Sequence, residues 1–238
     1  MIGIDLGLKH FYTDQNGNTV DCPKFLRRSE KRLKRHQRKL SRMFVKGAKP
    51  QSKNYHKQRK RLGKVHLKVQ RQRRDWAIKL ARCVVMSSDI VVYEDLQVQN
   101  LVKNHHLAKS IQDASWSLFT QWLDYYGKIW DKVVVAVPPH YTTQDCSNCG
   151  HRVQKTLSTR THQCPVCLFV GDRDRNAALN ILKRGLEMLG IVWNNGTSGH
   201  EGTAPQGGTT GETGTSADER QLELVSAVAE PVTRILAL

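Results

Sequence analysis

The chain has 238 residues with 38 lysines and arginines against 21 acidic residues, which gives a formal net charge of +17. The length allows one or two domains, and no apolar run exceeds five residues, which excludes a membrane-spanning helix. The first residues do not resemble a signal peptide, and six cysteines in such a basic chain argue against a disulfide scaffold. We therefore expect a soluble, cytoplasmic protein with no membrane partner.

The N-terminal stretch MIGIDLGLKHF is apolar apart from a few positions. Residues 1–6 predict a strand and residues 10–14 a second one, followed by a turn at Asn16-Gly17-Asn18. Asp5 lies within the first strand, between two glycines. An unpaired carboxylate is costly in a buried strand, so Asp5 calls for a partner or a function.

A concentrated basic block follows. Residues 24–75 hold 22 of the 38 lysines and arginines and only two acidic residues, so this block carries +20 and the rest of the chain −3 (+17 less +20). Gly47 and Pro50 divide it into two helical arms. One apolar face recurs along the second arm and beyond it, formed by Leu62, Val65, Val69, Trp76, Leu80 and Val84. Such a block is typical of a protein that binds a polyanion. We expect a nucleic acid rather than an anionic membrane, the alternative being a solubilising or disordered basic segment.

Strands and helices alternate through the middle of the chain. Residues 89–94 (DIVVYE) predict a central strand, residues 107–130 a helix, and residues 132–137 (KVVVAV) a buried strand that ends at Pro138-Pro139. Residues 174–189 predict a final helix. This alternation indicates an α/β core.

Four cysteines form the sharpest motif, C-x2-C-x14-C-x2-C, at Cys146, Cys149, Cys164 and Cys167. Two such knuckles place four sulfurs around one ion, as in structural zinc sites. The alternatives are two disulfides or unrelated buried thiols. Because a closed four-cysteine site leaves no open coordination position, this Zn²⁺ is expected to be structural. Cys22 and Cys83 lie outside the motif.

Three carboxylates stand at the ends of predicted core elements. Asp5 ends the first strand, Glu94 ends the strand of residues 89–94, and Asp174 opens the last helix. If the two strands are neighbours and the helix begins nearby, these acids converge and repel one another unless metal cations neutralise them. Oxygen ligands without histidine suit Mg²⁺ or Mn²⁺, and two such ions can promote hydrolysis of a phosphodiester.

Each of these acids also has a simpler explanation. Asp5 could bond turn amides, Glu94 could pair with an arginine, and Asp174 could interact with the helix N-terminus. Asp172 competes with Asp174 for the site. Since Asp172 stands just before the helix, where an N-cap residue is favoured, we assign Asp172 to the cap and Asp174 to the metal site.

Four segments, in this order, resemble the TnpB family: GIDLGLKHF, VVYEDLQVQNLVKN, YTTQDCSNCGHR with CPVCLF, and DRDRNAALNIL. TnpB proteins are transposon-associated OrfB-type transposases, similar to the nuclease half of type V CRISPR effectors. The resemblance covers about residues 1–190. It implies an α/β, RNase H-like (RuvC) mixed sheet with flanking helices, a long basic helical insertion and an inserted four-cysteine zinc ribbon. It also implies metal-dependent DNA cleavage guided by a transposon-encoded RNA, with Asp5, Glu94 and Asp174 as the catalytic acids.

The resemblance also implies a domain organisation. It places a nuclease core with a basic helical insertion at residues 1–140 (insertion about 24–88), then the zinc ribbon at 141–170, then the last nuclease motif with its helix at 171–190. The composition beyond the resemblance predicts a flexible Gly/Thr-rich tail at residues 191–238. Family members carry an N-terminal half that holds the guide RNA and reads a short DNA motif. No counterpart precedes Met1, so we expect an N-terminally short form.

Three functions are compatible with these features. The first is a TnpB-like endonuclease with DNA and a guide RNA as partners. The second is a nucleic-acid-binding module, or an inactive transposon remnant, without independent cleavage. The third is an ATPase of the actin and Hsp70 type, whose phosphate loop can also follow a GIDLG-like strand, but the chain is short and basic for that fold. Metal-dependent nicking, salt-sensitive binding alone, and bound nucleotide would distinguish the three.

Overall fold

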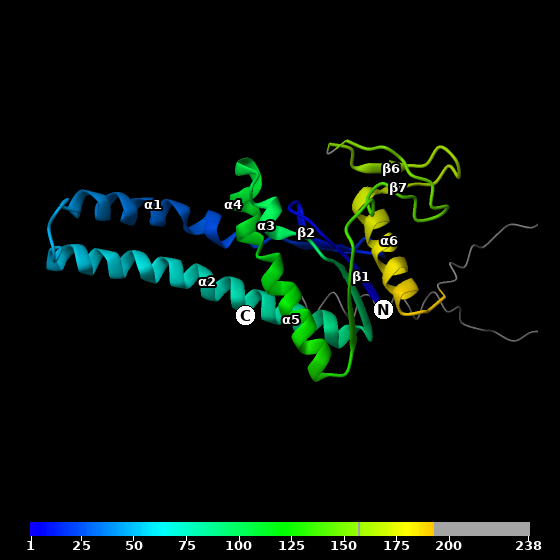
Figure 1. Ribbon diagram of the computed structural model, residues 1–238, viewed down its shortest axis with the longest axis horizontal. Helices are drawn as coiled ribbons and strands as arrows, with labels where there is room; N and C mark the ends of the chain where they lie inside the picture. The colour runs from blue at the N-terminus through cyan, green and yellow to red at the C-terminus, as the bar shows by residue number, and fades with distance from the viewer. Residues whose placement is uncertain (157, 193–238) are drawn as a thin grey trace, which may run out of the picture. The chain divides into compact units, whose positions relative to one another are not determined.

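The computed structural model describes residues 1–156 and 158–192 (Figure 1). The chain divides into two units, Met1–Gly185 and Leu186–Leu238. The architecture below is that of the first unit, whose last helix continues a few residues beyond it. From residue 193 on, the tail expected from the sequence lies outside the described residues. None of the described helices is both long and apolar enough to cross a membrane.

A five-stranded mixed sheet forms the core. Its strands run in the order β3-β2-β1-β4-β5, with β1 at Ile2–Leu6, β2 at His10–Asp14, β3 at Thr19–Asp21, β4 at Ile90–Glu94 and β5 at Val133–Val137. The first three strands are antiparallel, whereas β4 and β5 run parallel to β1. This is the RNase H-like arrangement expected from the sequence. Strand β3 was not predicted because it has only three residues and no buried side chain.

Two sequence predictions require correction here. The helix expected over residues 107–130 is two helices, α4 (His105–Ala114) and α5 (Trp116–Ile129), preceded by the short α3 (Val98–Leu101). Ser115 breaks it by adopting a left-handed conformation with φ of 59°, which the apolar periodicity does not reveal. The strand β5 is not buried along its length, because it is the edge of the sheet and exposes Val133 and Ala136.

The last helix, α6 (Arg173–Met188), lies directly against the two central strands. A Cβ on Gly3 would stand 2.5 Å from the Ala178 carbonyl oxygen and 2.6 Å from Leu182 Cβ. A Cβ on Gly185 would stand 2.4 Å from Val92 Cγ1. The two glycines therefore let the helix approach β1 and β4 closely, and this contact fixes where the N-terminus of α6 lies.

Two long helices, α1 (Phe25–Met43) and α2 (Lys53–Ser87), form the basic hairpin and lie side by side (Figure 1). They confirm the two arms predicted on either side of Gly47 and Pro50. Gln58 is only 2% exposed and its side-chain Nε2 donates to the His36 carbonyl oxygen at 3.0 Å, so a buried polar contact joins the arms. The predicted apolar face of α2 is buried, except that Leu62 is half-buried.

Asp113 of α4 fixes the base of this hairpin. Its carboxylate accepts hydrogen bonds from the backbone N–H groups of Leu26 (2.9 Å) and Arg27 (3.2 Å), in the first turn of α1. It also accepts from the guanidinium of Arg73 on α2, at 2.8 Å. Because no side chain at its own N-terminus caps α1, this buried carboxylate is both the cap of α1 and the ion-pair partner of α2.

We expect Asp113→Ala to lower the free energy of unfolding by about 3–5 kcal/mol, the usual cost of removing one partner of a buried ion pair. The variant leaves the half-buried guanidinium of Arg73 and two helix N–H groups without their acceptor. Chemical denaturation followed by circular dichroism measures the change. The matched control is Asp75→Ala, which removes an exposed carboxylate paired with Lys79 and should cost under about 1 kcal/mol. Equal losses in the two variants would contradict the role given to Asp113.

Candidate active site and zinc centre

Asp5 and Glu94 are brought together by the pairing of β1 with β4. The two strands are parallel, and their register places Ile4 opposite Tyr93. The next residue on each strand is therefore Asp5 on β1 and Glu94 on β4, as the sequence predicted for neighbouring strands. Both carboxylates are buried, with residue exposures of 9% and 6%.

The third predicted acid, Asp174, lies in the first turn of α6. Its backbone N–H and that of Arg175 donate to Asp172 Oδ1, at 2.9 and 3.0 Å. Asp172 therefore caps the helix, as predicted, and leaves the Asp174 side chain available for other contacts. The Asp174 carboxylate accepts from the guanidinium of the adjacent Arg173, with the shorter bond at 2.7 Å.

The electrostatics place these acids near one another. Burial, followed by the charges of Glu94 and Asp174, holds the pKa of Asp5 well above its usual range, and Arg173 opposes this rise. Burial also raises the pKa of Glu94, against a hydrogen bond from Thr142 and the charge of Arg184. Within residues 1–156 and 158–192, however, the four motif cysteines are the only group of three or more potential metal ligands, with ligand atoms within 4.8 Å of one another. The three carboxylates thus share one region without all meeting at coordination distance.

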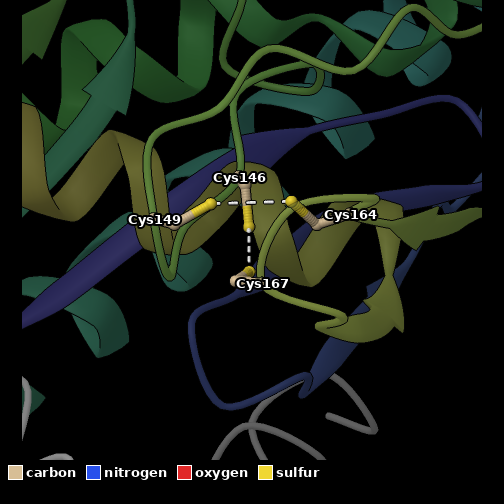
Figure 2. A group of neighbouring side chains, drawn as sticks. All are labelled: Cys146, Cys149, Cys164 and Cys167. Carbon is tan, nitrogen blue, oxygen red and sulfur yellow. Dashed lines mark hydrogen bonds between the residues drawn. The ribbon is translucent and has the colours of Figure 1, made fainter.

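The four cysteines of the motif converge on one point (Figure 2). Sγ of Cys146 lies 3.6 Å from Sγ of Cys167, and Sγ of Cys149 lies 3.5 Å from Sγ of Cys164. These separations exceed a disulfide bond of about 2.0 Å, and the thiols are free. The short antiparallel pair β6 (Thr161–Gln163) and β7 (Val170–Asp172) flanks the second knuckle. The cluster therefore suits a closed, tetrahedral structural zinc.

The surroundings of Cys167 favour metal binding further. A hydrogen bond from the Asn148 side chain and one from the backbone of Phe169 lower the pKa of Cys167 to about 6. Burial instead raises the pKa of Cys146. At neutral pH the cluster thus offers one ready thiolate, and a bound cation is needed to hold several thiolates together.

We expect one Zn²⁺ per chain of purified protein, measured by elemental analysis alongside a thiol titration. Cys164→Ser should lose the zinc, because removing one of four ligands opens the tetrahedron. Cys83→Ser is the matched control, since Cys83 lies on α2 outside the cluster, and it should retain one zinc. A folded protein with four intact thiols and no zinc would contradict this prediction.

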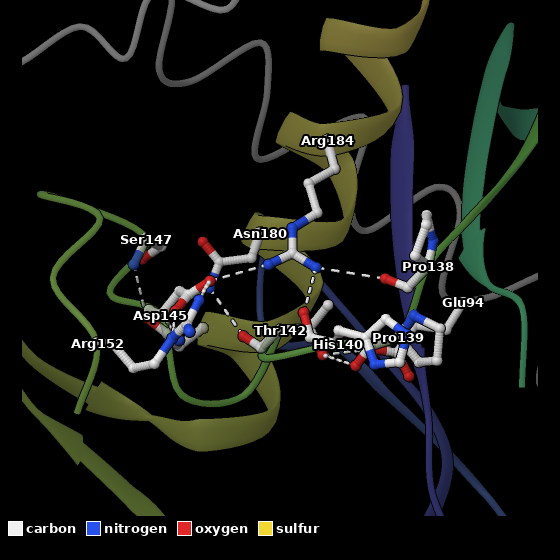
Figure 3. A network of polar contacts seen from close by, with 11 residues as sticks. Glu94, Pro138, Pro139, His140, Thr142, Asp145, Ser147, Arg152, Asn180 and Arg184 are labelled. Atoms are coloured by element: carbon white, nitrogen blue, oxygen red, sulfur yellow. Dashed lines mark hydrogen bonds and ion pairs between the residues drawn. The ribbon is translucent and has the colours of Figure 1, made fainter. Parts of the chain in front are cut away.

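A polar network joins the zinc region to the sheet, and sequence reasoning missed it (Figure 3). Asn176, Asn180 and Arg184 stand one turn apart along α6 and contact the segment between β5 and the first knuckle. Within that segment, Thr142 donates to a carboxylate oxygen of Glu94. The available signal was the presence of Asn176 and Asn180 among apolar helix residues, since a buried amide needs partners.

An RNase H-like sheet with buried acids on its two central strands, together with a four-cysteine cluster, is the combination expected above for the TnpB-like class of proteins. The comparisons with known proteins agree with that class. Residues 1–105 match the OrfB family of IS605-type elements, described as "Probable transposase", and residues 116–181 match the Cas12f1-like TNB domain.

Relatives of known sequence point to the same family. One is the "Putative RNA-guided DNA endonuclease" of Streptomyces pristinaespiralis, 36% identical over 187 residues, covering 78% of this chain and 45% of the relative. Another is the "Putative RNA-guided DNA endonuclease InsQ" of Escherichia coli (strain K12), 32% identical, covering 79% of this chain and 50% of the relative. The "TnpB-like protein L79" of Acanthamoeba polyphaga mimivirus is 30% identical, covering 78% of this chain and 37% of the relative.

A solved structure shares the fold. The chain aligns with a protein chain from the cryo-EM structure of the Cas12f1-sgRNA-target DNA complex, with a TM-score of 0.51 and 20% identity, over 76% of this chain and 49% of that one. The protein therefore belongs to the TnpB/OrfB family of IS605-type elements, which is related to Cas12f. It spans half the length, or less, of the relatives named above.

Proposed function

We propose that this chain is the catalytic part of a TnpB-like, RNA-guided DNA endonuclease. The observation that carries the proposal is the parallel pairing of β1 with β4, which sets two buried carboxylates, Asp5 and Glu94, side by side at the ends of the central strands. Protein interiors rarely keep such a cluster without a cation or a function. On this proposal the nuclease core, zinc ribbon and last nuclease motif occupy residues 1–140, 141–170 and 171–190.

The chemistry follows from the donor set. Asp5, Glu94 and Asp174 offer only carboxylate oxygens, which suit Mg²⁺ or Mn²⁺. Such a cation would activate a water and stabilise the leaving oxygen of a phosphodiester. Three elements fix the positions of these carboxylates. Strands β1 and β4 hold Asp5 and Glu94, and the cap at Asp172 orients the first turn of α6, which carries Asp174. In the structure Arg173 supplies the positive charge beside Asp174.

The basic hairpin provides the nucleic-acid contact in this proposal. Most lysines and arginines of α1 and α2 are exposed, while Asp113 and the Gln58–His36 contact hold the two helices in place. Phosphate contacts of this kind bind without reading sequence. Target choice would come from base pairing with a guide RNA, and the reaction would take place on DNA in the cytoplasm.

A binding module without cleavage is the second candidate. It is favoured by two observations: the three carboxylates do not all meet at coordination distance among the described residues, and Asp174 is paired with Arg173. In that case the hairpin and zinc region would hold nucleic acid, or a full-length family member, without hydrolysing it.

The test is a nicking assay with single-stranded and duplex DNA, with Mg²⁺, Mn²⁺ or a chelator, and with or without the transposon-end RNA. Because the chain matches half, or less, of the length of the relatives named above, we expect slow, metal-dependent nicking of single strands that is indifferent to sequence. Binding that falls with salt, with no nicking in any metal, would favour the binding module. Efficient guide-directed cutting of duplex DNA would show that this half is sufficient for the full reaction.

A further inference from the structure

Thr142 makes a direct contact with Glu94. Thr142 is only 2% exposed, and its hydroxyl donates a hydrogen bond to Glu94 Oε1. A hydroxyl has one proton, and the other acceptor in reach, the Pro139 carbonyl oxygen, is distant at 3.4 Å. The proton is therefore directed at the carboxylate, since hydrogen bonds to ionised acceptors are the stronger ones.

The backbone of Thr142 is in turn held by α6. Asn180 Nδ2 donates to the Thr142 carbonyl oxygen at 2.8 Å and to the Asp145 carbonyl oxygen at 2.7 Å. Asn180 is 6% exposed, so this amide is committed to the contact. The position of Thr142 thus depends on the same helix that carries Asp174 at its start.

The same helix face holds the chain up to the first zinc-binding cysteine. Asn176 Nδ2 donates to the Asp145 carbonyl oxygen at 2.8 Å, and Asn176 Oδ1 accepts from the backbone N–H of Ser147 at 3.0 Å. Arg184 adds a bond to Asp145 Oδ2 at 2.9 Å. Asp145 and Ser147 flank Cys146. Figure 3 shows how this network runs from Ser147 past Thr142 to Glu94.

We propose that Thr142 is a positioning residue for Glu94, and that the asparagines of α6 and the zinc cluster hold Thr142 where it can act. This inference rests on the proposed function, because it assigns Glu94 to a divalent-metal site. The zinc region would then be a support for that site as well as a folded unit of its own.

The physical reason lies in the geometry of a carboxylate. When the Thr142 hydroxyl donates to Oε1, the orientation of the Glu94 carboxylate is fixed, and Oε2 is left for a cation. Without this hydrogen bond, the buried Glu94 side chain loses a partner and can rotate. Residues that orient a metal ligand in this way typically contribute about 10–100-fold to metal affinity.

The experiment compares Thr142→Val with Thr142→Ser in the full chain. Valine keeps the branched shape without the hydroxyl, whereas serine keeps the hydroxyl. The probe is Mn²⁺, titrated into the protein and followed by electron paramagnetic resonance of the free ion. We expect Thr142→Val to weaken Mn²⁺ binding about 10–100-fold and Thr142→Ser to restore it, with one zinc per chain and unchanged DNA affinity in both. Thr142→Ala serves if the valine variant does not fold.

The outcomes separate this inference from the proposed function. Glu94→Gln and Asp5→Asn are measured beside the threonine variants. If those two weaken Mn²⁺ binding and Thr142→Val does not, the positioning role is wrong and the metal site stands. Equal weakening in the valine and serine variants would also overturn the role, since the hydroxyl would then not matter. If Glu94→Gln and Asp5→Asn bind Mn²⁺ like the parent, the proposed metal site itself fails.

Discussion

Asp5→Asn is expected to abolish metal-dependent nicking and, at the same time, to raise the melting temperature of the metal-free protein. Asparagine keeps the shape of the side chain but removes a buried charge that Glu94 and Asp174 repel. Added Mg²⁺ or Mn²⁺ should raise the melting temperature of the parent, because a ligand that binds only the folded state stabilises it. The variant should show no such rise. Thermal scans with and without metal, run beside the nicking assay, measure both effects.

The pH dependence gives the same prediction an independent check. The pKa of Asp5 in the folded chain lies well above its ordinary value, so between those two values the folded state binds more protons than the unfolded state. The free energy of unfolding of the metal-free parent should therefore fall as the pH rises through that window, starting near pH 4. Asp5→Asn should lack this part of the dependence. A parent that becomes more stable with rising pH over this range, and a variant that matches it, would contradict the charge clustering.

The same nicking assay applies to the other two proposed ligands, Glu94 and Asp174, and Asp172 provides the control. Glu94→Gln and Asp174→Asn should also abolish nicking while leaving DNA binding intact. Asp172→Ala should cost about 1 kcal/mol of stability as a lost helix cap and keep the nicking activity. If Asp172→Ala loses the activity and Asp174→Asn keeps it, the two roles are reversed.

Affinity for nucleic acid should fall about 10³–10⁵-fold between 50 and 200 mM salt, if the hairpin contacts six to ten phosphates. The reason is that each phosphate neutralised by a lysine or arginine releases counterions. The exposed cations of α1 and α2 are held on a hairpin fixed at its base by Asp113. Fluorescence anisotropy with a labelled DNA duplex, at several salt concentrations, gives the slope of affinity against salt.

Two triple variants with the same loss of charge test where that slope comes from. The first replaces Arg32, Arg35 and Lys39, exposed on α1, with glutamine. It should reduce the slope by about 3 for duplex DNA, since each lost contact accounts for about 0.9. The second replaces three exposed lysines outside the hairpin with glutamine, and it should change the slope little. These lysines are Lys103, Lys128 and Lys183. Equal reductions would show that net charge, and not the hairpin, determines binding.

Much of the fold could be predicted because its signals are local. The sequence itself shows the apolar runs of β1, β4 and β5, the break between the two helical arms at Gly47 and Pro50, and the spacing of the cysteines. The adjacency of Asp5 and Glu94 followed from one assumption, that the two strands are neighbours, and the parallel pairing of β1 with β4 confirms it. The zinc cluster needed no assumption beyond its spacing.

The features that escaped prediction depend on contacts between distant segments. Nothing in the sequence indicates that Asp113 caps the helix α1, whose Leu26 lies 87 residues earlier. The role of Thr142 depends on Asn180, 38 residues later, which donates to its carbonyl oxygen. Ser115 breaks a helix with a left-handed backbone that serine adopts only in a suitable context. Each of these follows from tertiary packing, which outweighs local preference.

The length of α2 sets a scale for the nucleic acid that the hairpin can hold. Its 35 residues rise about 52 Å at about 1.5 Å per residue, which is about 15 base pairs at roughly 35 Å for every 10 base pairs of duplex. The helix begins beyond the loop that joins the two arms and ends at Ser87, three residues before the strand that carries Glu94. Glu94 is the last residue of that strand, four residues on from Ile90, so the acidic cluster lies at the other end of β4, about 13 Å from its start. A duplex laid along α2 must exceed about one and a half turns to reach both ends of the helix at once.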